Sequence, residues 1–266
     1  MIIDGHSHVT LPIENYMKAM DEAGIDKTVL FSNSFHPELA KNAAEVKASM
    51  QYLNDLLSGK KGSMTEARIK SIAELVNIIN QYPSRFIGFG SVPVGQALKE
   101  TLQYISEHIQ KNKLVGIGEF TLGTGQAHLM DNIFEASSHF NNLPIWIHAF
   151  APLSLQDIRE ISEKAKAYPS IPVILGHLGG HNWIETMDLV KEIPNLYLDT
   201  SAYFSTFVLG VIINEIPDKC IFGVDMPFGD LQSAKEAILK LSKAPSIAAA
   251  VLGENIARIL KLQISE

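Results

Sequence analysis

The chain has 266 residues, 46% of them hydrophobic, enough to bury the core of one large domain over residues 1–266. Its 22 basic and 29 acidic residues give a formal net charge of −7, which argues against general nucleic-acid binding and favours a small-molecule partner. The single Cys220 excludes a disulfide framework within the chain, and no apolar run of about 18 residues or signal-peptide pattern predicts a membrane span. We therefore expect a soluble, unprocessed, cytoplasmic protein.

The chain opens with a short apolar strand that ends in His6-Ser-His8. Side chains alternate faces along a strand, so the two histidines are expected to point the same way and to bind one ion. A helix over 13–24 and a buried strand over 27–32 follow. The next segment, 33–62, contains a helical run over 38–57 and is longer than an ordinary connection, so we interpret it as a lid or specificity segment. An extra surface helix or a subunit contact is the alternative.

From Ser63 onward, strands and helices alternate. Ser63 to Glu66 form a predicted capping box, and apolar residues at helical spacing follow as far as Tyr82. The remaining predicted strands cover 85–92, 114–120, 143–148, 171–177, 195–199 and 219–225, and helices are predicted at about 98–109, 130–140, 154–165, 234–241 and 253–262.

Eight apolar strands that alternate with amphipathic helices predict a parallel sheet covered by helices, and in this length they indicate a closed (β/α)₈ TIM barrel with a helical insertion after the second strand. A doubly wound open sheet is the alternative. Its usual signature, a G-x-G-x-x-G loop after the first strand, is missing from Gly5-His-Ser-His8.

Polar residues of the kinds that bind metal ions stand at the ends of five of these strands. Taken singly, each has an ordinary explanation as a paired surface group, a core histidine or a turn cap. In a barrel, however, the carboxyl ends of the strands meet at one rim, where active sites form. The predicted ligands are His6, His8, Glu119, His148, His177 and Asp225.

Further residues near the strand ends are candidates for binding substrate. Asp199 ends the seventh strand, where it could contact substrate or a ligand residue. The other candidates for the substrate wall are Phe35, His36, Trp183 and Phe228. Other site chemistries lack support, because the sequence has no G-x-S-x-G and one cysteine cannot form C-x-x-C.

In these motifs the chain resembles the amidohydrolase superfamily, in its amidohydrolase-related branch. The resemblance spans nearly the whole chain and is carried by residues 4–8, 116–119, 145–148, 175–180, 196–202, 222–230 and 253–258. It implies a (β/α)₈ barrel in which His6, His8 and His148 bind a divalent metal, most often Zn²⁺. It also implies that Asp225 is both a ligand and the proton shuttle, whereas Glu119 occupies the place of a carboxylate that bridges two metals in TatD-like deoxyribonucleases.

The resemblance implies hydrolysis of an amide, ester or lactone of a small molecule by water activated on the ion. His177 would then stabilise the oxyanion at a one-metal site, or join Glu119 in binding a second ion. Two alternatives remain open: nonoxidative decarboxylation of an aromatic or unsaturated acid, and a TatD-like nuclease. The number of ions and the oligomeric state, including a homo-oligomer, are also open.

Overall fold

Eight short parallel strands form the centre of the structure, a computed structural model that describes residues 1–57, 60 and 62–262 but not the side chains of Leu56 and Leu57. Each strand pairs with the next along the chain, in the order β1 to β8. The predicted (β/α)₈ barrel is therefore confirmed. The strands are β1 Ile3–His8, β2 Lys27–Phe31, β3 Phe86–Gly90, β4 Gly116–Phe120, β5 Ile145–Ile147, β6 Val173–Leu175, β7 Leu196–Asp199 and β8 Cys220–Ile221.

Backbone hydrogen bonds between the first strand and the chain after β8 complete the ring. The Gly5 amide donates to the Phe222 carbonyl at 2.7 Å, and the Val224 amide donates to the His6 carbonyl at 3.1 Å. Glycine is required at position 5 because a Cβ there would lie 2.6 Å from Ile221 Cγ2. This close approach brings the end of β8 beside the histidines of β1.

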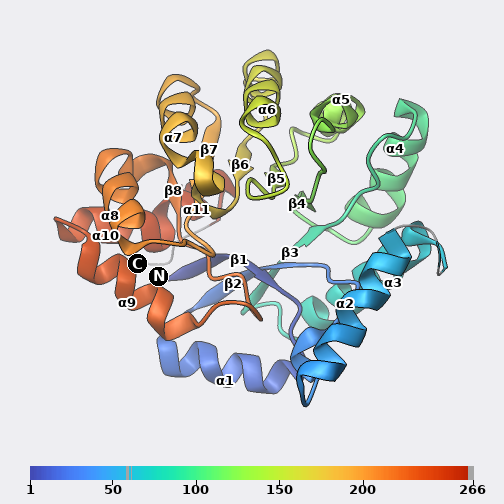
Figure 1. Cartoon of the computed structure of the whole chain (residues 1–266), viewed down its shortest axis with the longest axis horizontal. Helices are drawn as coiled ribbons and strands as arrows, with labels where there is room; N and C mark the ends of the chain where they lie inside the picture. The colour runs from blue at the N-terminus through green and yellow to red at the C-terminus, as the bar shows by residue number, and fades with distance from the viewer. Residues whose placement is uncertain (58–59, 61, 263–266) are drawn as a thin grey trace.

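Helices surround the strands on their outer side (Figure 1). The first helix ends where predicted, at Gly24, whose φ of 66° lies in the left-handed region that favours glycine. Ser154 and Asp157 form a reciprocal capping box at the start of α6. The helices are α1 Ile13–Ala23, α2 Ala43–Leu57, α3 Met64–Gln81, α4 Leu98–Tyr104, α5 Asp131–His139, α6 Leu155–Ala167, α7 Trp183–Glu192, α8 Thr206–Glu215, α9 Leu231–Leu241, α10 Pro245–Ala249 and α11 Asn255–Ile259.

Two predicted elements differ from the structure in extent. The helical run expected over 38–57 is broken, because Ala40 is extended and Asn42 Oδ1 accepts the amides of Ala44 and Glu45, so that α2 begins after it. The strand expected over 219–225 ends early. Its last residue, Asp225, has a φ of 64° and donates its amide to the His6 carbonyl, which turns the chain out of the sheet.

The inside of the barrel is filled by large side chains that support the rim. Trp146 is fully buried, and its ring lies 5.3 Å from that of Phe31 and 5.8 Å from that of Phe89. His6 lies against the same group, with ring centroids 5.5 Å from Trp146 and 4.8 Å from Phe31. A second, larger apolar layer fills the space between the strands and the helices. Large, buried rings therefore fill the barrel beneath His6.

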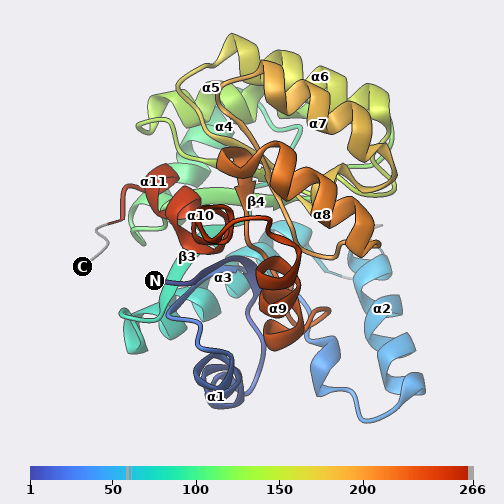
Figure 2. The ribbon, with the colours of Figure 1, turned by 90° about the vertical axis from the view of Figure 1, so that its left-hand side faces the viewer.

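The insertion after β2 contributes α2, which lies at one side of the ribbon, whereas α11 lies at the opposite side (Figure 2). Part of the predicted hinge, Gly59-Lys-Lys-Gly62, lies outside the described residues. Within the described part of the chain, no helix is both long and apolar enough to cross a membrane.

Candidate metal centre

Both histidines of β1 lie on the inner side of the barrel, as their spacing predicts. Their ring centroids are 5.5 Å apart, and His6 is fully buried. The Nε2 atoms of His6 and His8 lie 3.5 and 3.6 Å from the same carboxylate oxygen, Oε2 of Glu119 at the end of β4. Residues separated by more than 100 positions thus meet above the packed interior.

Asp225 joins this group from the chain after β8. Its Oδ1 lies 3.2 Å from His8 Nε2, and the ligand atoms of His6, His8 and Asp225 all lie within 4.8 Å of one another. Asp225 holds its position although a φ of 64° is uncommon for a residue with a side chain. Its carbonyl accepts the amides of Phe228 and Gly229, which stabilise the turn.

The second oxygen of Glu119 faces a different group of residues. Glu119 Oε1 lies 3.1 Å from His148 Nδ1 and 3.2 Å from His177 Nε2. The two histidine nitrogens are 2.9 Å apart, and the three side chains form a second group with metal-ligand spacing. The structure therefore brings all six predicted ligands together, with Glu119 in the middle.

The donor atoms fit divalent cations. His6 Nε2 is buried and has no hydrogen-bond partner among the described residues, although it points toward Glu119 and the His8 side of the centre. A buried nitrogen without a partner is costly, and a bound cation would satisfy it. Imidazole and carboxylate are the ligands that Zn²⁺ and similar first-row ions take.

A layer of hydrogen bonds beneath the centre orients two of the histidines. The buried Asp199 accepts a hydrogen bond from His6 Nδ1 at 2.8 Å and another from Trp146 Nε1 at 2.8 Å. The Ser201 hydroxyl donates to Asp199 and accepts from His177 Nδ1 at 2.9 Å. With their Nδ1 atoms engaged in this way, His6 and His177 present Nε2 to the centre.

Asp199 therefore contacts a predicted ligand rather than the space where a substrate would lie, and the strand-end pattern does not reveal its partners. Trp146 lies within an apolar strand, so the sequence predicts only that it packs in the core. Ser201 follows Asp199 by two residues and lies within 196–202, a segment that carries the family resemblance, and these are the signals that could have pointed to it.

The acidic and basic groups of the centre shift one another's pKa values. Burial alone would raise the pKa of Glu119, but the charge of His6 and hydrogen bonds from His148 and His177 hold it well below its usual range. Burial would lower the pKa of His6, yet the carboxylates of Asp199 and Glu119 hold this pKa well above its usual value. Against the same burial penalty, His6 lowers the pKa of Asp199 to about 2. Glu119 and Asp199 are thus held as anions facing the histidines.

Asp4 connects the two strands that carry three of the ligands. Its carboxylate accepts hydrogen bonds from the Ser7 hydroxyl at 2.5 Å and from the amides of His6 and Val224, each at 3.1 Å. Tyr16 of α1 donates a further one at 3.3 Å. Burial raises the pKa of Asp4 to about 7 in spite of these bonds. Asp4 lies outside the predicted ligand set and acts by holding β1 against the end of β8.

His36, predicted to bind substrate, pairs with two carboxylates. Its Nδ1 lies 2.9 Å from Glu38 Oε1, and its Nε2 lies 3.0 Å from Glu74 Oε2 on α3. Glu38 also accepts the amide of Leu11, in the loop after β1. His36 thus connects the loop after β2 to two neighbouring elements, and both of its ring nitrogens are occupied.

The remaining predicted substrate residues differ in exposure. Phe228 follows Asp225 by three residues, and 61% of its side chain is exposed. Phe35 is half-buried in the loop after β2. Trp183 is half-buried at the start of α7 and packs against the large apolar layer. Only Phe228 has both the exposure and the position in the sequence expected of a residue beside the ligands.

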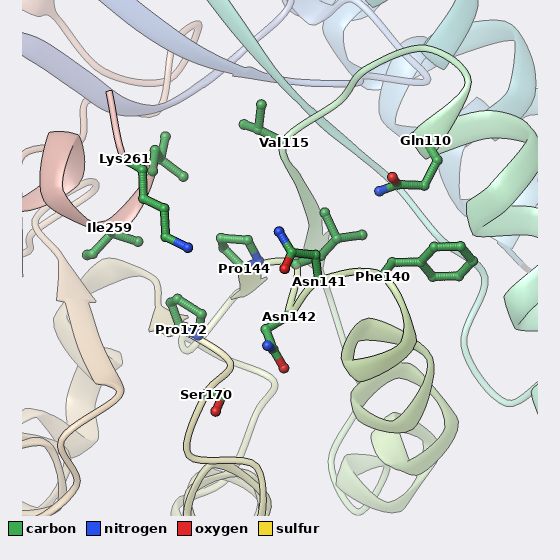
Figure 3. A pocket seen from close by; sticks show the side chains of 12 residues that line it. Gln110, Val115, Phe140, Asn141, Asn142, Pro144, Ser170, Pro172, Ile259 and Lys261 are labelled. Carbon is green, nitrogen blue, oxygen red and sulfur yellow. The ribbon is translucent and has the colours of Figure 1, made fainter. Parts of the chain in front are cut away.

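A pocket of about 310 Å³ lies at the other end of the barrel (Figure 3). Val115, Pro144 and Pro172 immediately precede strands β4, β5 and β6 and line this pocket together with the end of α11. Lys261 is its single charged residue. The pocket is therefore separate from the metal centre, which lies at the carboxyl ends of the strands.

Sequence comparison identifies one family. The sequence model of the amidohydrolase family matches residues 3–262, nearly the whole chain. Among curated proteins, none matches the chain.

Solved structures with the same fold include enzymes of several activities. The 2,6-dihydroxybenzoate decarboxylase from Rhizobium is 16% identical, with 98% of each chain covered and a TM-score of 0.68. A dihydroxybenzoic acid decarboxylase from Polaromonas, which holds manganese, is 15% identical, with 99% of this chain and 98% of that one covered and a TM-score of 0.69. The 4-oxalomesaconate hydratase from Rhodopseudomonas palustris is 16% identical, with 98% and 96% covered and a TM-score of 0.66. At this identity the likeness shows the fold alone.

Proposed function

The chain belongs to the amidohydrolase family, and from this premise we propose that it is a hydrolase with two divalent cations, bridged by Glu119. The substrate is a small molecule with an amide, ester or lactone bond. Held by these residues, the cations would supply an activated water and stabilise the negative charge that develops on the scissile carbonyl.

The division of the Glu119 carboxylate between two groups of ligands is the observation that carries this proposal. Oε2 faces His6 and His8, and Oε1 faces His148 and His177. Each oxygen of the carboxylate thus lies near a separate pair of histidines, which is the arrangement that two ions sharing Glu119 would need. The buried, unpartnered Nε2 of His6 adds a site that a cation would satisfy.

Two ions would share six side chains. His6, His8 and Asp225 would hold one ion, and His148 and His177 the other, with Glu119 between them. Zn²⁺ fits these nitrogen and oxygen donors, and Mn²⁺ is an alternative of similar ligand preference. When bound, a divalent cation polarises a carbonyl oxygen and lowers the pKa of water from about 15.7 toward about 7.

The side chains of the protein would carry the proton and maintain the geometry. Asp225 is buried beside His8, and it would take the proton of the attacking water and deliver it to the leaving group. Asp199 keeps His6 in the orientation that presents Nε2, and Ser201 does the same for His177. The rings of Phe31 and Trp146 pack against His6 and would keep water from reaching it from that side.

Nonoxidative decarboxylation of an aromatic or unsaturated acid is the second candidate. The group His6, His8 and Asp225 is by itself sufficient to bind one ion. His148 and His177 would then be free to move a proton. The fold likeness to the decarboxylases from Rhizobium and Polaromonas favours this alternative.

Counting metal ions separates the two candidates. We expect the wild-type protein, purified without chelator and measured by inductively coupled plasma mass spectrometry, to contain two equivalents of metal. Glu119→Gln should lower the metal content to about one equivalent, because the glutamine amide has a single, uncharged oxygen and cannot serve two cations as a carboxylate can. Parallel assays with a panel of lactones, esters, amides and carboxylic acids identify the reaction.

Glu100→Gln is the matched control, since Glu100 lies in the first turn of α4 and outside the centre. It should leave the metal content unchanged. One equivalent in the wild type, unaltered by Glu119→Gln and accompanied by carbon dioxide release from an acid, would replace the hydrolase by the decarboxylase. A protein that binds no metal would exclude both.

A further inference from the structure

Helix α8 differs in composition from the other long helices of the barrel. Residues 200–214, which include all of α8 except its last residue, contain no charged side chain. Each of the other described helices of ten or more residues carries at least three. A helix that is apolar all round is normally covered on every side. Figure 2, however, shows α8 at the surface of the ribbon, between α7 and α9.

The inner side of α8 is packed, whereas its outer side is open. The buried residues of the inner side are Val208, Leu209, Ile212 and Ile213. On the outer side, Phe207 is 71% exposed, more than any other large hydrophobic side chain among the described residues. Phe204, just before the helix, is also half exposed. A continuous apolar surface of this kind is typical of a contact with another molecule.

A groove of about 380 Å³ runs along the outer side of α8. Gly210 and Val211 line it, together with Leu241 and Lys243 from the end of α9 and the residue that follows. A Cβ at position 210 would meet Leu241 Cδ2 at 3.7 Å, an ordinary contact, so alanine would fit there and would favour the helix. Packing within the chain therefore does not explain this glycine, whereas the close approach of a second surface does.

The outer side of α8 is complementary to itself. Its outward residues are Phe207, Gly210, Val211 and Asn214, which are neighbours on one helix face. An antiparallel pair of α8 helices with a twofold axis between Gly210 and Val211 places Val211 of each copy over Gly210 of the other. The same axis places Phe207 beside Asn214. The space left by the glycine is in this way filled by a side chain of the same patch.

The charge at the end of α8 favours the antiparallel orientation. Glu215, the last residue of the helix, lines the groove and pairs with Lys191 at 2.8 Å, whereas the first turn contains no acidic residue. Antiparallel packing brings the Glu215 carboxylate near the amino-terminal end of the other helix, whose free N–H groups and dipole favour negative charge. Parallel packing would bring two Glu215 carboxylates together.

We propose that the protein forms a homodimer in which the outer side of α8 packs antiparallel against the same side of a second copy. A second copy is the occupant because the groove, the side chain that fills it and the complementary helix ends all belong to one patch. The interface does not depend on the metal centre, so it stands or falls separately from the proposed function.

Sedimentation velocity of the full chain over a wide range of concentration tests the dimer. We expect the wild-type protein to sediment with twice the mass of the chain. Gly210→Ala should keep the fold, as measured by circular dichroism, but weaken dimerisation by about tenfold or more, because each copy presents an added methyl at the closest approach. A glycine that served only the helix of its own chain would not give this result.

Phe207→Glu tests the side chain at the edge of the groove. Because Phe207 is exposed within the chain, the variant should fold, yet dimerisation should weaken by at least about 100-fold, since two carboxylates would be buried without partners. Val46→Glu is the matched control. It places the same charge on an exposed apolar residue of α2, 40% exposed, and should leave the dimer intact.

A protein that remains a monomer at every concentration would overturn the inference. So would a dimer that Phe207→Glu or Gly210→Ala leaves unchanged. A dimer that dissociates in Val46→Glu but not in Phe207→Glu would place the contact on α2 and would equally overturn it.

Discussion

Asp225 is the residue on which the proposed proton transfer depends. It lies 3.2 Å from His8 Nε2, and its φ of 64° is a conformation that aspartate and asparagine tolerate better than most residues. Asp225→Asn should therefore fold and keep an oxygen ligand, but an amide cannot accept the proton. We expect turnover to fall about 10²–10⁴-fold, with metal content retained, as measured by steady-state kinetics and metal analysis.

Asp230→Asn serves as its control. Asp230 lies in the same loop and caps α9 by accepting the Ser233 amide, so the substitution changes the charge nearby without changing a ligand. Its turnover should match the wild type. Full activity in Asp225→Asn would rule out Asp225 as the proton carrier.

Asp199 acts on the centre through His6. The two side chains are 193 residues apart in sequence and joined by a 2.8 Å hydrogen bond. In Asp199→Asn the carboxylate that orients the His6 ring is lost, and we expect metal affinity to fall about 10–100-fold. Competition with a fluorescent chelator measures this.

A second buried aspartate provides the comparison for Asp199→Asn. Asp157 caps α6 and accepts amides of the loop after β4, away from the ligands. Asp157→Asn should reduce stability but leave metal affinity unchanged. Equal loss of affinity in both variants would mean that Asp199 matters only for folding.

At the scale of elements, the segment after β2 is the least ordinary part of the barrel. It contributes α2, whose Val46, Met50 and Tyr52 expose 40–46% of their side chains. Such exposure fits a lid that closes on a substrate and also fits a subunit contact, so both interpretations of 33–62 remain predictions. The ion pairs of His36 attach the start of this segment to α3.

His36 should make the anchoring of this segment depend on pH. The hydrogen bond to Glu38 raises the pKa of His36, burial opposes the shift, and Glu74 adds to it. A raised folded pKa means that the stabilisation is complete below the unfolded value of about 6.5 and is lost as pH rises through the folded value. The stability difference between wild type and His36→Gln should therefore be largest near pH 5.5 and shrink toward pH 9, as measured by urea denaturation.

His139→Gln is the corresponding control, because His139 is exposed on α5 and its ion pair within the described part of the chain is with Glu135 of the same helix. Its effect on stability should be small throughout this range. A His36→Gln difference that stays constant or grows with pH would contradict the assignment.

For the whole molecule, metal binding and folding should be coupled. The six predicted ligands come from the ends of five strands that meet only in the closed barrel. A ligand that binds only the folded state stabilises it by about 2.7 kcal/mol at a free concentration one hundred times its Kd. For a chain of this size, that stabilisation would raise Tm by on the order of 5–10 °C. Differential scanning calorimetry with chelator, and after Zn²⁺ or Mn²⁺ is restored, measures the shift.

The triple variant His6→Ala, His148→Ala, Asp225→Ala removes ligands of both groups and controls for ions bound elsewhere. Its Tm should not respond to added metal. An equal Tm for the wild-type protein with and without metal would indicate that no cation binds within the barrel.

The architecture and the list of ligands follow from local pattern. Strands of a parallel barrel are buried on both faces and read as apolar runs, so a histidine or carboxylate at the end of such a run stands out. His148 after Ile145-Trp-Ile147 is an example, and the structure brings it to the centre. The strand ends are less well predicted. The end of β8 is determined by hydrogen bonds to β1, which no local window contains.

The sequence by itself determined that the barrel has eight strands and that the ends of five of them bring the six predicted ligands to one rim, because the alternation along each strand and the repeated order of strand and helix can be read locally. Only the tertiary structure decided that Glu119 divides its oxygens between two groups and that Asp199 turns inward to His6. These contacts depend on the stagger between strands, a property of the closed barrel that no single segment encodes.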